Sequence, residues 1–355
     1  MQSLRFPWSL THIARMPHPD ISRVADEFLA AGGETGKQDG AMARRHTLAT
    51  YRLVIRLLTE MQLQGVVALA RLVDQDYLGG NALVALLAEA GRLRPEALES
   101  SACLLDRPIT IRAMARSFRR PYETMRRALH RLSELGLVDL REDGVVLAQG
   151  VVERAEIRAY LSHMHDIMVT FLEDLFVFAR LPVPEMLRSD PAMADHRQRL
   201  IKLAALDLHL LSVEGMQGIF SDWTGLLLAA AITAGNIRDV TYHPQLAFTY
   251  AAADSIPPME LRRPVLFRTL CDTLPLCPTT AWRRIAVMKM LGSIRTIDGG
   301  LILDSKWLGH PALIANACER IERMHAIINR MVQSGVALDA IGDLYIRGRV
   351  DPIDL

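Results

Sequence analysis

The sequence predicts a mainly α-helical protein with small β-hairpins, in which one chain carries the same structural unit twice. Apolar residues recur every three to four positions over most of the chain, which is the pattern of amphipathic helices. The segment Arg107–Leu147 aligns without a gap on Arg263–Leu303, and nine of the 41 positions are identical. Each copy ends in two short alternating stretches around a glycine-containing turn, which indicates a hairpin. An internal repeat constrains the architecture more than any single element does.

The chain before the first copy is predicted to be helical after an N-terminal lead. Ile21–Ala31 has the spacing of a short amphipathic helix, and the glycine-rich stretch Gly32–Gly40 is typical of a flexible linker. From Ala41 the chain is predicted to be mostly helical, because apolar residues recur at three-to-four-residue spacing, first at Leu53, Leu57 and Met61 and then at Val66, Leu69 and Leu72. Asn81–Ala90 is a further apolar helix, which Gly91 is expected to end.

The first copy has the pattern of two helices followed by a hairpin. Arg112–Phe118 is expected to form a short helix, and Glu123–Leu135 a second one with its apolar residues on one face. Gly136 would end the second helix as a left-handed cap. Two strands are then expected at residues 137–140 and 145–148, joined by a tight turn.

The first copy resembles bacterial winged helix-turn-helix transcriptional regulators of the MarR and GntR kind, because its residues 111–147 read IRAMARSFRRPYETMRRALHRLSELGLVDLREDGVVL. In that family Thr–x–x–Arg opens the recognition helix, and here it is Thr124–Arg127. The family pattern Leu–x–x–x–Gly–Leu–Val before the wing corresponds to Leu132–Val138. The second copy keeps Thr280–Arg283 but has Ser293 at a position that is usually apolar.

The resemblance implies two winged helix-turn-helix domains in one chain. In MarR-like dimers, terminal helices pack together and hold two winged helices on one face. Apolar stripes at Ile157–Leu175 and Ile314–Met331 follow the two copies, so we expect a shared helical layer and a single-chain pseudo-dimer. The alternative is that each stripe packs only on its own domain. The expected divisions are an N-terminal helix and linker (1–40), a first helical and winged-helix repeat (41–181), a junction (182–191), a second such repeat (192–335) and a C-terminal tail (336–355).

Charge is unevenly distributed along the chain, although 41 Lys and Arg against 40 Asp and Glu give a formal net charge of only +1. Arg107–Arg131 carries a net charge of +7 and Arg262–Arg295 a net charge of +6, which leaves −12 on the other 296 residues. Most charge runs are simply solvated faces. Here both basic blocks coincide with a helix-turn-helix pattern, and arginine neutralises phosphates and reads guanine in the major groove. We therefore expect both blocks to bind DNA.

The candidate DNA-binding residues lie on the turn, the recognition helix and the wing of each copy. Arg119 and Thr124 are expected to contact phosphates. The residues expected to enter the groove are Arg126, Arg127, His130 and Arg131. Arg141 is expected to lie at the wing. Matching candidates in the second copy are Thr279, Thr280, Arg283, Arg284 and Lys289. Trp282 is either exposed for stacking on DNA or, as is more usual, packed in a core or between domains. Instead of contacting DNA, Arg127 and Arg283 could form ion pairs within their own domains.

Other classes of protein find little support in the sequence. The four cysteines have no CxxC spacing, which fits a reducing cytoplasmic location and neither a disulfide framework nor a zinc site. The apolar run Trp223–Ile232 is shorter than the roughly 20 residues that a membrane span needs. His163 and His165 are two positions apart and would point to different faces of a helix, so one metal ion is not expected between them. No glycine-rich cofactor loop or hydrolase motif occurs.

The sequence therefore predicts a DNA-binding transcriptional regulator that is not an enzyme, needs no cofactor and binds double-stranded DNA. It would act as a monomeric pseudo-dimer or as a homodimer. Three alternatives stay open. The first is a winged-helix scaffold for protein interactions. The second is a sensor of an unknown small-molecule effector, with a pocket in the helical layer around Trp223 and no direct DNA readout. The third is a plasmid-type replication initiator, which also pairs two winged helices.

Overall fold

A computed structural model describes residues 37–74, 76–179, 193–215, 222–274, 276–338 and 340–355. The described residues are mainly helical, with four short strands. The elements of the first half are α3 (Lys37–Leu72), α4 (Tyr77–Leu93), η1 (Pro95–Leu98), η2 (Ser101–Cys103), α5 (Ile111–Ser117), α6 (Tyr122–Glu134), β1 (Val138–Arg141), β2 (Gly144–Leu147) and α7 (Ala155–Ala179). Those of the second half are α8 (Ala194–Gly215), α9 (Trp223–Asn236), α10 (Arg238–Thr241), α11 (Pro244–Thr249), η4 (Met259–Leu261), α12 (Phe267–Thr273), α13 (Pro278–Met290), β3 (Ile294–Ile297), β4 (Gly300–Leu303), α14 (Ser305–Leu308), α15 (Pro311–Gln333) and η5 (Ile341–Leu344).

The sequence repeat is also a structural repeat. Elements α12, α13, β3 and β4 begin and end 156 residues after α5, α6, β1 and β2 respectively. Both hairpins are antiparallel with the same register, since Val138 pairs with Leu147 and Ile294 pairs with Leu303. A single bridge adds Ile109 to the first hairpin, and its counterpart adds Val265 to the second. We call α4 to β2 the first unit and α9 with α12 to β4 the second unit.

Two pairs of repeated glycines explain why the sequence match is concentrated at these positions. Gly136 and Gly292 follow α6 and α13 with φ angles of +66° and +70°, which only glycine adopts readily. Gly136 is therefore the left-handed cap that the sequence predicts. At Gly144 a Cβ atom would lie 2.6 Å from the Ile109 carbonyl oxygen, so the hairpin can approach the chain before α5 only if this residue has no side chain.

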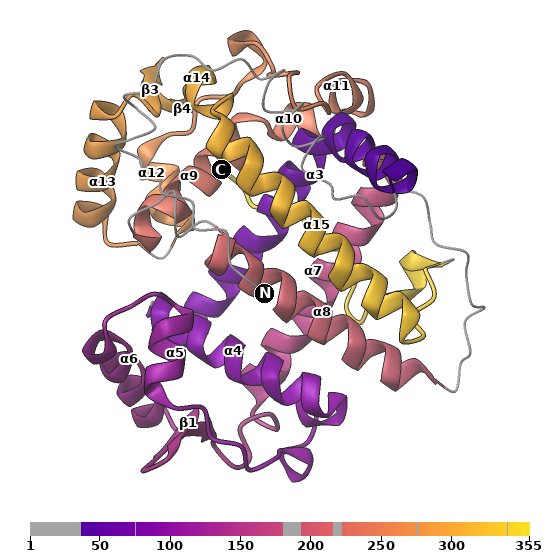
Figure 1. Cartoon of the computed structure of the whole chain (residues 1–355). Coiled ribbons are helices and arrows are strands. Elements are labelled where there is room, and N and C mark those ends of the chain that lie inside the picture. The colour runs from indigo at the N-terminus through magenta and orange to yellow at the C-terminus, as the bar shows by residue number, and fades with distance from the viewer. Residues whose placement is uncertain (1–36, 75, 180–192, 216–221, 275, 339) are drawn as a thin grey trace.

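Four long helices form a layer that joins the two units. Helix α7 packs against both α3 and α8, and α15 packs against both α8 and α3. The apolar stripes that follow the two hairpins therefore pack across the halves of the chain as well as within them. In Figure 1 the first unit lies at the lower left and the second at the upper left, while α7 and α15 cross the centre of the view toward the right.

The described core consists of two apolar clusters. The larger one joins the first unit to the four-helix layer, with Met125, Leu129 and Leu132 of α6 almost completely buried. The smaller one fills the second unit and includes Ile285 of α13. The first unit is thus continuous with the main core of the layer, whereas the second packs around a separate cluster that also includes Leu63 and Val67 of α3.

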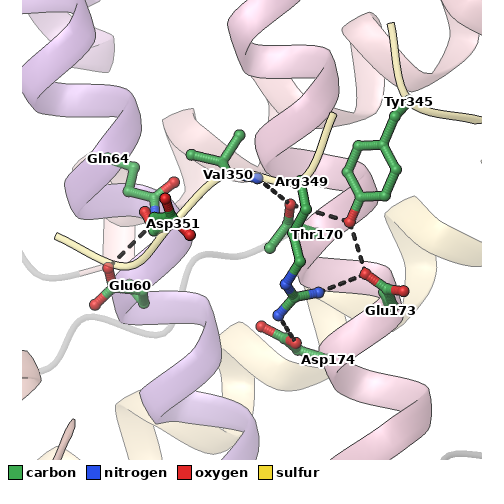
Figure 2. A network of polar contacts seen from close by, with 9 residues as sticks. All are labelled: Glu60, Gln64, Thr170, Glu173, Asp174, Tyr345, Arg349, Val350 and Asp351. Carbon is green, nitrogen blue, oxygen red and sulfur yellow. Dashed lines mark hydrogen bonds and ion pairs between the residues drawn. The ribbon is translucent and has the colours of Figure 1, made fainter. Parts of the chain in front are cut away.

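The expected C-terminal tail is a packed segment that runs across α7 and α3 (Figure 2). Its end reaches the second unit, where the Thr273 hydroxyl donates to the Asp354 carbonyl at 3.1 Å. The Tyr345 hydroxyl donates to the Glu173 carboxylate at 2.7 Å, and the Val350 N–H donates to the Thr170 hydroxyl at 3.1 Å. Arg349 forms ion pairs with Glu173 and with the buried Asp174. Because these contacts reach α7 from the far end of the chain, they fix the layer across the repeat.

Several sequence-based boundaries differ from the structure. Helix α3 begins at Lys37, inside the predicted linker, and the remainder of that linker lies outside the described residues, as do the helix predicted at Ile21–Ala31 and the junction at 182–191. Gly91 does not end its helix, because α4 continues to Leu93. It serves close packing instead, since a Cβ atom there would lie 3.0 Å from the Leu98 side chain.

One described helix is long and apolar enough to cross a membrane. This is Leu48–Leu72 of α3, and 72% of its most apolar window is buried inside the protein. A core helix of a soluble protein passes the same test, so the finding is weak evidence for a membrane span.

Candidate nucleic-acid interface

Helix α6 presents most of the predicted groove-contacting residues on one exposed face. The helix begins after Pro121, whose fixed φ suits the turn that separates it from α5. Its apolar side chains at 125, 128, 129 and 132 are buried because they recur at helical spacing. On the other face Thr124, Arg127, His130 and Arg131 are exposed, and Arg126 is half-buried between the two faces. The sequence prediction and the structure therefore agree on which side of α6 faces solvent.

The cations of α6 differ in how firmly they are already paired. Arg126 donates to Glu123 at 2.9 Å and lies 3.2 Å from the His130 ring nitrogen Nε2. Arg131 forms an ion pair of 3.2 Å with Asp76, the residue that caps α4. Arg127 has no ion-pair partner among the described residues. Its charge is therefore the most available one on this helix, and the ion pair considered for it in the sequence is not present there.

The turn before α6 adds further exposed positive charge. Arg119 has a φ angle of +49°, and the next N–H, from Arg120, closes the turn on the Ala115 carbonyl at 2.9 Å. This left-handed conformation leaves the Arg119 side chain exposed beside the N-terminus of α6. Helix α5 contributes Arg112 and Arg116, which are also exposed. The first unit therefore gathers a basic surface from α5, the turn and α6.

The hairpin tips are less suited to a phosphate backbone than the sequence suggests. Arg141 ends β1 and forms an ion pair with Asp106. The two residues that follow it at the tip are the exposed acids Glu142 and Asp143. Because a DNA backbone is negatively charged, these carboxylates oppose the contact expected of Arg141.

The second unit exposes fewer free cations. Helix α13 buries Ala281, Ile285 and Met288, as α6 does at equivalent positions. Its predicted contact residues are exposed in four of five cases, which are Thr279, Thr280, Arg283 and Lys289. Arg283 has no ion-pair partner in the described part of the chain. Arg284 instead turns toward the body of the unit and pairs with Asp222, the capping residue of α9.

Exposed apolar side chains distinguish α13 from α6. Trp282 is 58% exposed and packs edge-on against Phe267, with 5.4 Å between ring centroids. Leu266 and Met290 are 53% and 78% exposed. The expectation that Trp282 packs in a core or between domains is therefore wrong, because the core positions of α13 are filled by smaller residues on its opposite face.

Several polar residues that the sequence could not place are buried inside the protein. Arg262, counted above in the second basic block, is 4% exposed and contributes nothing to the surface charge. His165 is buried beside Asp166 at 3.0 Å. His209 Nε2 lies 2.9 Å from the Asn81 amide oxygen, and burial lowers its pKa to about 4. In the described part of the chain, no three His, Cys, Asp or Glu side chains are grouped so that they could hold a metal ion.

Comparison with known proteins gives no function for this surface. No protein-family model matches the chain, and neither a curated protein nor a solved structure matches it.

Proposed function

We propose that this protein is a DNA-binding transcriptional regulator built as a single-chain pseudo-dimer of two winged helix-turn-helix units. The observation that carries the proposal is the coincidence of α6, an amphipathic helix after a tight turn, with a basic exposed surface. The same elements recur 156 residues later in the second unit. A solvated charged face would not need to coincide with this arrangement, and the equivalent helix of the second unit keeps Arg283 and Lys289 exposed.

In this proposal α6 enters the major groove of DNA. Arg127, exposed and unpaired among the described residues, is suited to a bidentate contact with guanine. Arg119 and Thr124 lie at the N-terminal end of α6, where phosphate contacts position a recognition helix. Arg126 and Arg131 can also contact DNA once their ion pairs with Glu123 and Asp76 are broken.

The two units would engage DNA unequally. Between residue 107 and α6 the first unit carries four exposed arginines without an ion pair among the described residues, namely Arg107, Arg112, Arg116 and Arg119. In the second unit Arg268 pairs with Asp272, Arg284 with Asp222 and Arg295 with Asp304. The first unit therefore supplies most of the affinity, and the second adds a weaker half-site.

In this proposal the two units bind one stretch of duplex. In the view of Figure 1, α6 and α13 both lie at the left-hand edge, away from α7 and α15, and the two hairpins lie at opposite ends. Paired recognition helices of this class read half-sites about 34 Å apart, one turn of DNA.

The test is the salt dependence of binding to a fluorescently labelled duplex of mixed sequence, measured by anisotropy. If the unpaired arginines Arg107, Arg112, Arg116, Arg119 and Arg127 each neutralise one phosphate, log K falls with log salt with a slope of about −4.5. Arg119→Gln should reduce the slope by about 0.9. Arg330→Gln, which changes an exposed arginine on α15, is the matched control and should leave the slope unchanged. An absence of binding at low salt would rule out the proposal.

A second candidate function rests on the apolar surface of the second unit. Leu266, Trp282 and Met290 are each exposed on a unit with few free cations, and exposed large apolar side chains are typical of a protein-docking site rather than of a phosphate-binding one. Trp282→Ala with Met290→Ala should leave DNA affinity within about twofold if this surface docks a protein. A loss of DNA affinity as large as that of Arg283→Ala would show instead that Trp282 contacts DNA.

A further inference from the structure

A cavity of about 170 Å³ lies where the helical layer meets the second unit. Its walls come from α3, α9, the short helix α14 and α15. Most of the lining is apolar, and Tyr51, Trp223 and Trp307 contribute aromatic rings. The cavity lies away from the exposed face of α6, so the proposed DNA contacts do not account for it.

Four buried arginines line this apolar cavity, which is an unusual composition. Arg52, Arg56, Arg262 and Arg320 are 8%, 5%, 4% and 6% exposed. No Asp or Glu is among the described residues that line it. A buried charge without a counter-charge is strongly unfavourable, so this cluster needs an explanation.

Arg262 is explained by the fold. Its Nε and Nη2 atoms donate to the Pro257 carbonyl at 2.8 and 2.6 Å, and its Nη1 atom donates to the Leu303 carbonyl at 3.0 Å. Nη2 also donates to the Ser305 hydroxyl at 2.8 Å. Each nitrogen of this guanidinium therefore has a partner, and we assign it a structural role.

The other three arginines retain unused donors. Arg52 has no hydrogen-bond partner for Nε or Nη2 in the described part of the protein, Arg56 has none for Nη1, and Arg320 has none for Nε. Arg56 is otherwise anchored by backbone carbonyls of Arg52, Ala247 and Tyr250. These N–H groups have no acceptor among the described residues, and the three side chains that carry them line the cavity.

Arg56 and Arg320 stay charged in this environment. Burial, together with the charge of neighbouring Arg52, lowers the pKa of Arg56 to about 9. Burial lowers the pKa of Arg320 to about 10, against a smaller opposing effect of Tyr51. Both groups are therefore cationic at neutral pH, and a negative ligand would offset the cost of burying them.

We propose that this cavity binds a small carboxylate with a compact apolar body, its carboxylate bound by Arg52, Arg56 and Arg320 and its body packed against Trp223 and Trp307. A cavity of about 150 Å³ can hold a benzene-sized molecule, so the volume admits one ring or a short branched chain. A planar carboxylate matches the fork of guanidinium donors. The apolar walls disfavour a fully hydrated ion such as phosphate. This site does not depend on DNA binding.

The test is isothermal titration of the full chain with benzoate and hexanoate. Their neutral counterparts, benzyl alcohol and hexanol, and inorganic phosphate serve as comparison probes. We expect saturable one-to-one binding of at least one carboxylate, and at least about tenfold weaker binding of its neutral counterpart, because charged hydrogen bonds are lost. Phosphate should also bind at least about tenfold more weakly. Equal affinity for the neutral probe or for phosphate would overturn the proposed ligand class, and failure of both carboxylates to bind would overturn the site.

Variants separate ligand binding from folding. Arg52→Met and Arg320→Met should each weaken carboxylate binding at least about tenfold. Arg71→Gln, an exposed arginine on the same helix α3, is the matched control and should bind as the parent does. Without ligand, Arg52→Met should melt at the same temperature as the parent or higher, because it removes a buried charge that has no ion-pair partner among the described residues and only a longer-range attraction to Asp254. Unchanged carboxylate affinity in both methionine variants would overturn the assignment.

Discussion

Replacement of Arg127 by alanine tests how α6 reads DNA. Its guanidinium is exposed and has no ion pair among the described residues, so no internal contact has to break before it reaches a base. A bidentate contact to guanine is worth about 1–3 kcal/mol, which corresponds to roughly 5- to 150-fold in affinity. Arg126→Ala should cost less, because Arg126 first gives up an exposed pair with Glu123 worth about 0–1 kcal/mol.

Anisotropy titrations on a selected binding site measure these effects. Arg127→Lys keeps the charge but not the planar fork, so it should lose most of the sequence preference and little of the salt slope. The free energy of unfolding of Arg127→Ala should stay within about 0.5 kcal/mol of the parent, since the side chain contacts no core residue. Binding of Arg127→Ala within twofold of the parent, or a larger effect of Arg126→Ala, would refute the assignment of Arg127 as the principal reader.

Three further predictions concern stability and are measured by urea unfolding. Gly136→Ala should lower the free energy of unfolding by about 1–2 kcal/mol, because a side chain is strained at a φ of +66°. Burial holds the pKa of His209 at about 4, below the value near 6.5 of an unfolded chain. Neutral His209 therefore makes its full contribution to the free energy of unfolding above pH 6.5. As the pH falls toward 4, the protein loses roughly 3 kcal/mol of this free energy, and His209→Gln should flatten this part of the pH profile of stability. Arg349→Ala should lower the free energy of unfolding by about 1–3 kcal/mol, because it leaves Asp174, whose side chain is 5% exposed, without its ion pair. A change near zero would show that the C-terminal segment does not stabilise the helical layer.

The repeated units are the part of the fold that sequence alone predicts well. Two independent signals coincide there, namely helical apolar spacing and the matched positions of Gly136 and Gly144 in the two copies. The predicted helix at 112–118 is found at Ile111–Ser117, one residue earlier. Local geometry dictates these elements, so a local pattern suffices to find them.

The sequence predicts the charge distribution of the candidate site less well. A count of basic residues cannot tell exposed Arg283 from Arg284, which turns inward to Asp222 across a different element. Nor can it show that Arg262 is buried against backbone carbonyls of distant residues. Both outcomes depend on contacts between segments far apart in the chain, which periodicity and composition do not report.

The same limitation applies to packing on the surface. Gly91 looks like a helix stop, but its small size serves contact with Leu98. Trp282 looks like a core residue, but the register of α13 leaves it exposed. In each case tertiary packing decides between two roles that one residue type can have.

Selection of bound fragments from a genomic or random pool, followed by footprinting of the intact chain, tests the central proposal most directly. Two unlike recognition units in one chain predict a footprint with two unlike half-sites whose centres lie about one DNA turn apart. Arg127→Ala should remove protection of the stronger half-site and Arg283→Ala that of the weaker one. Recovery of no enriched sequence, or protection of one half-site that neither substitution alters, would contradict the account.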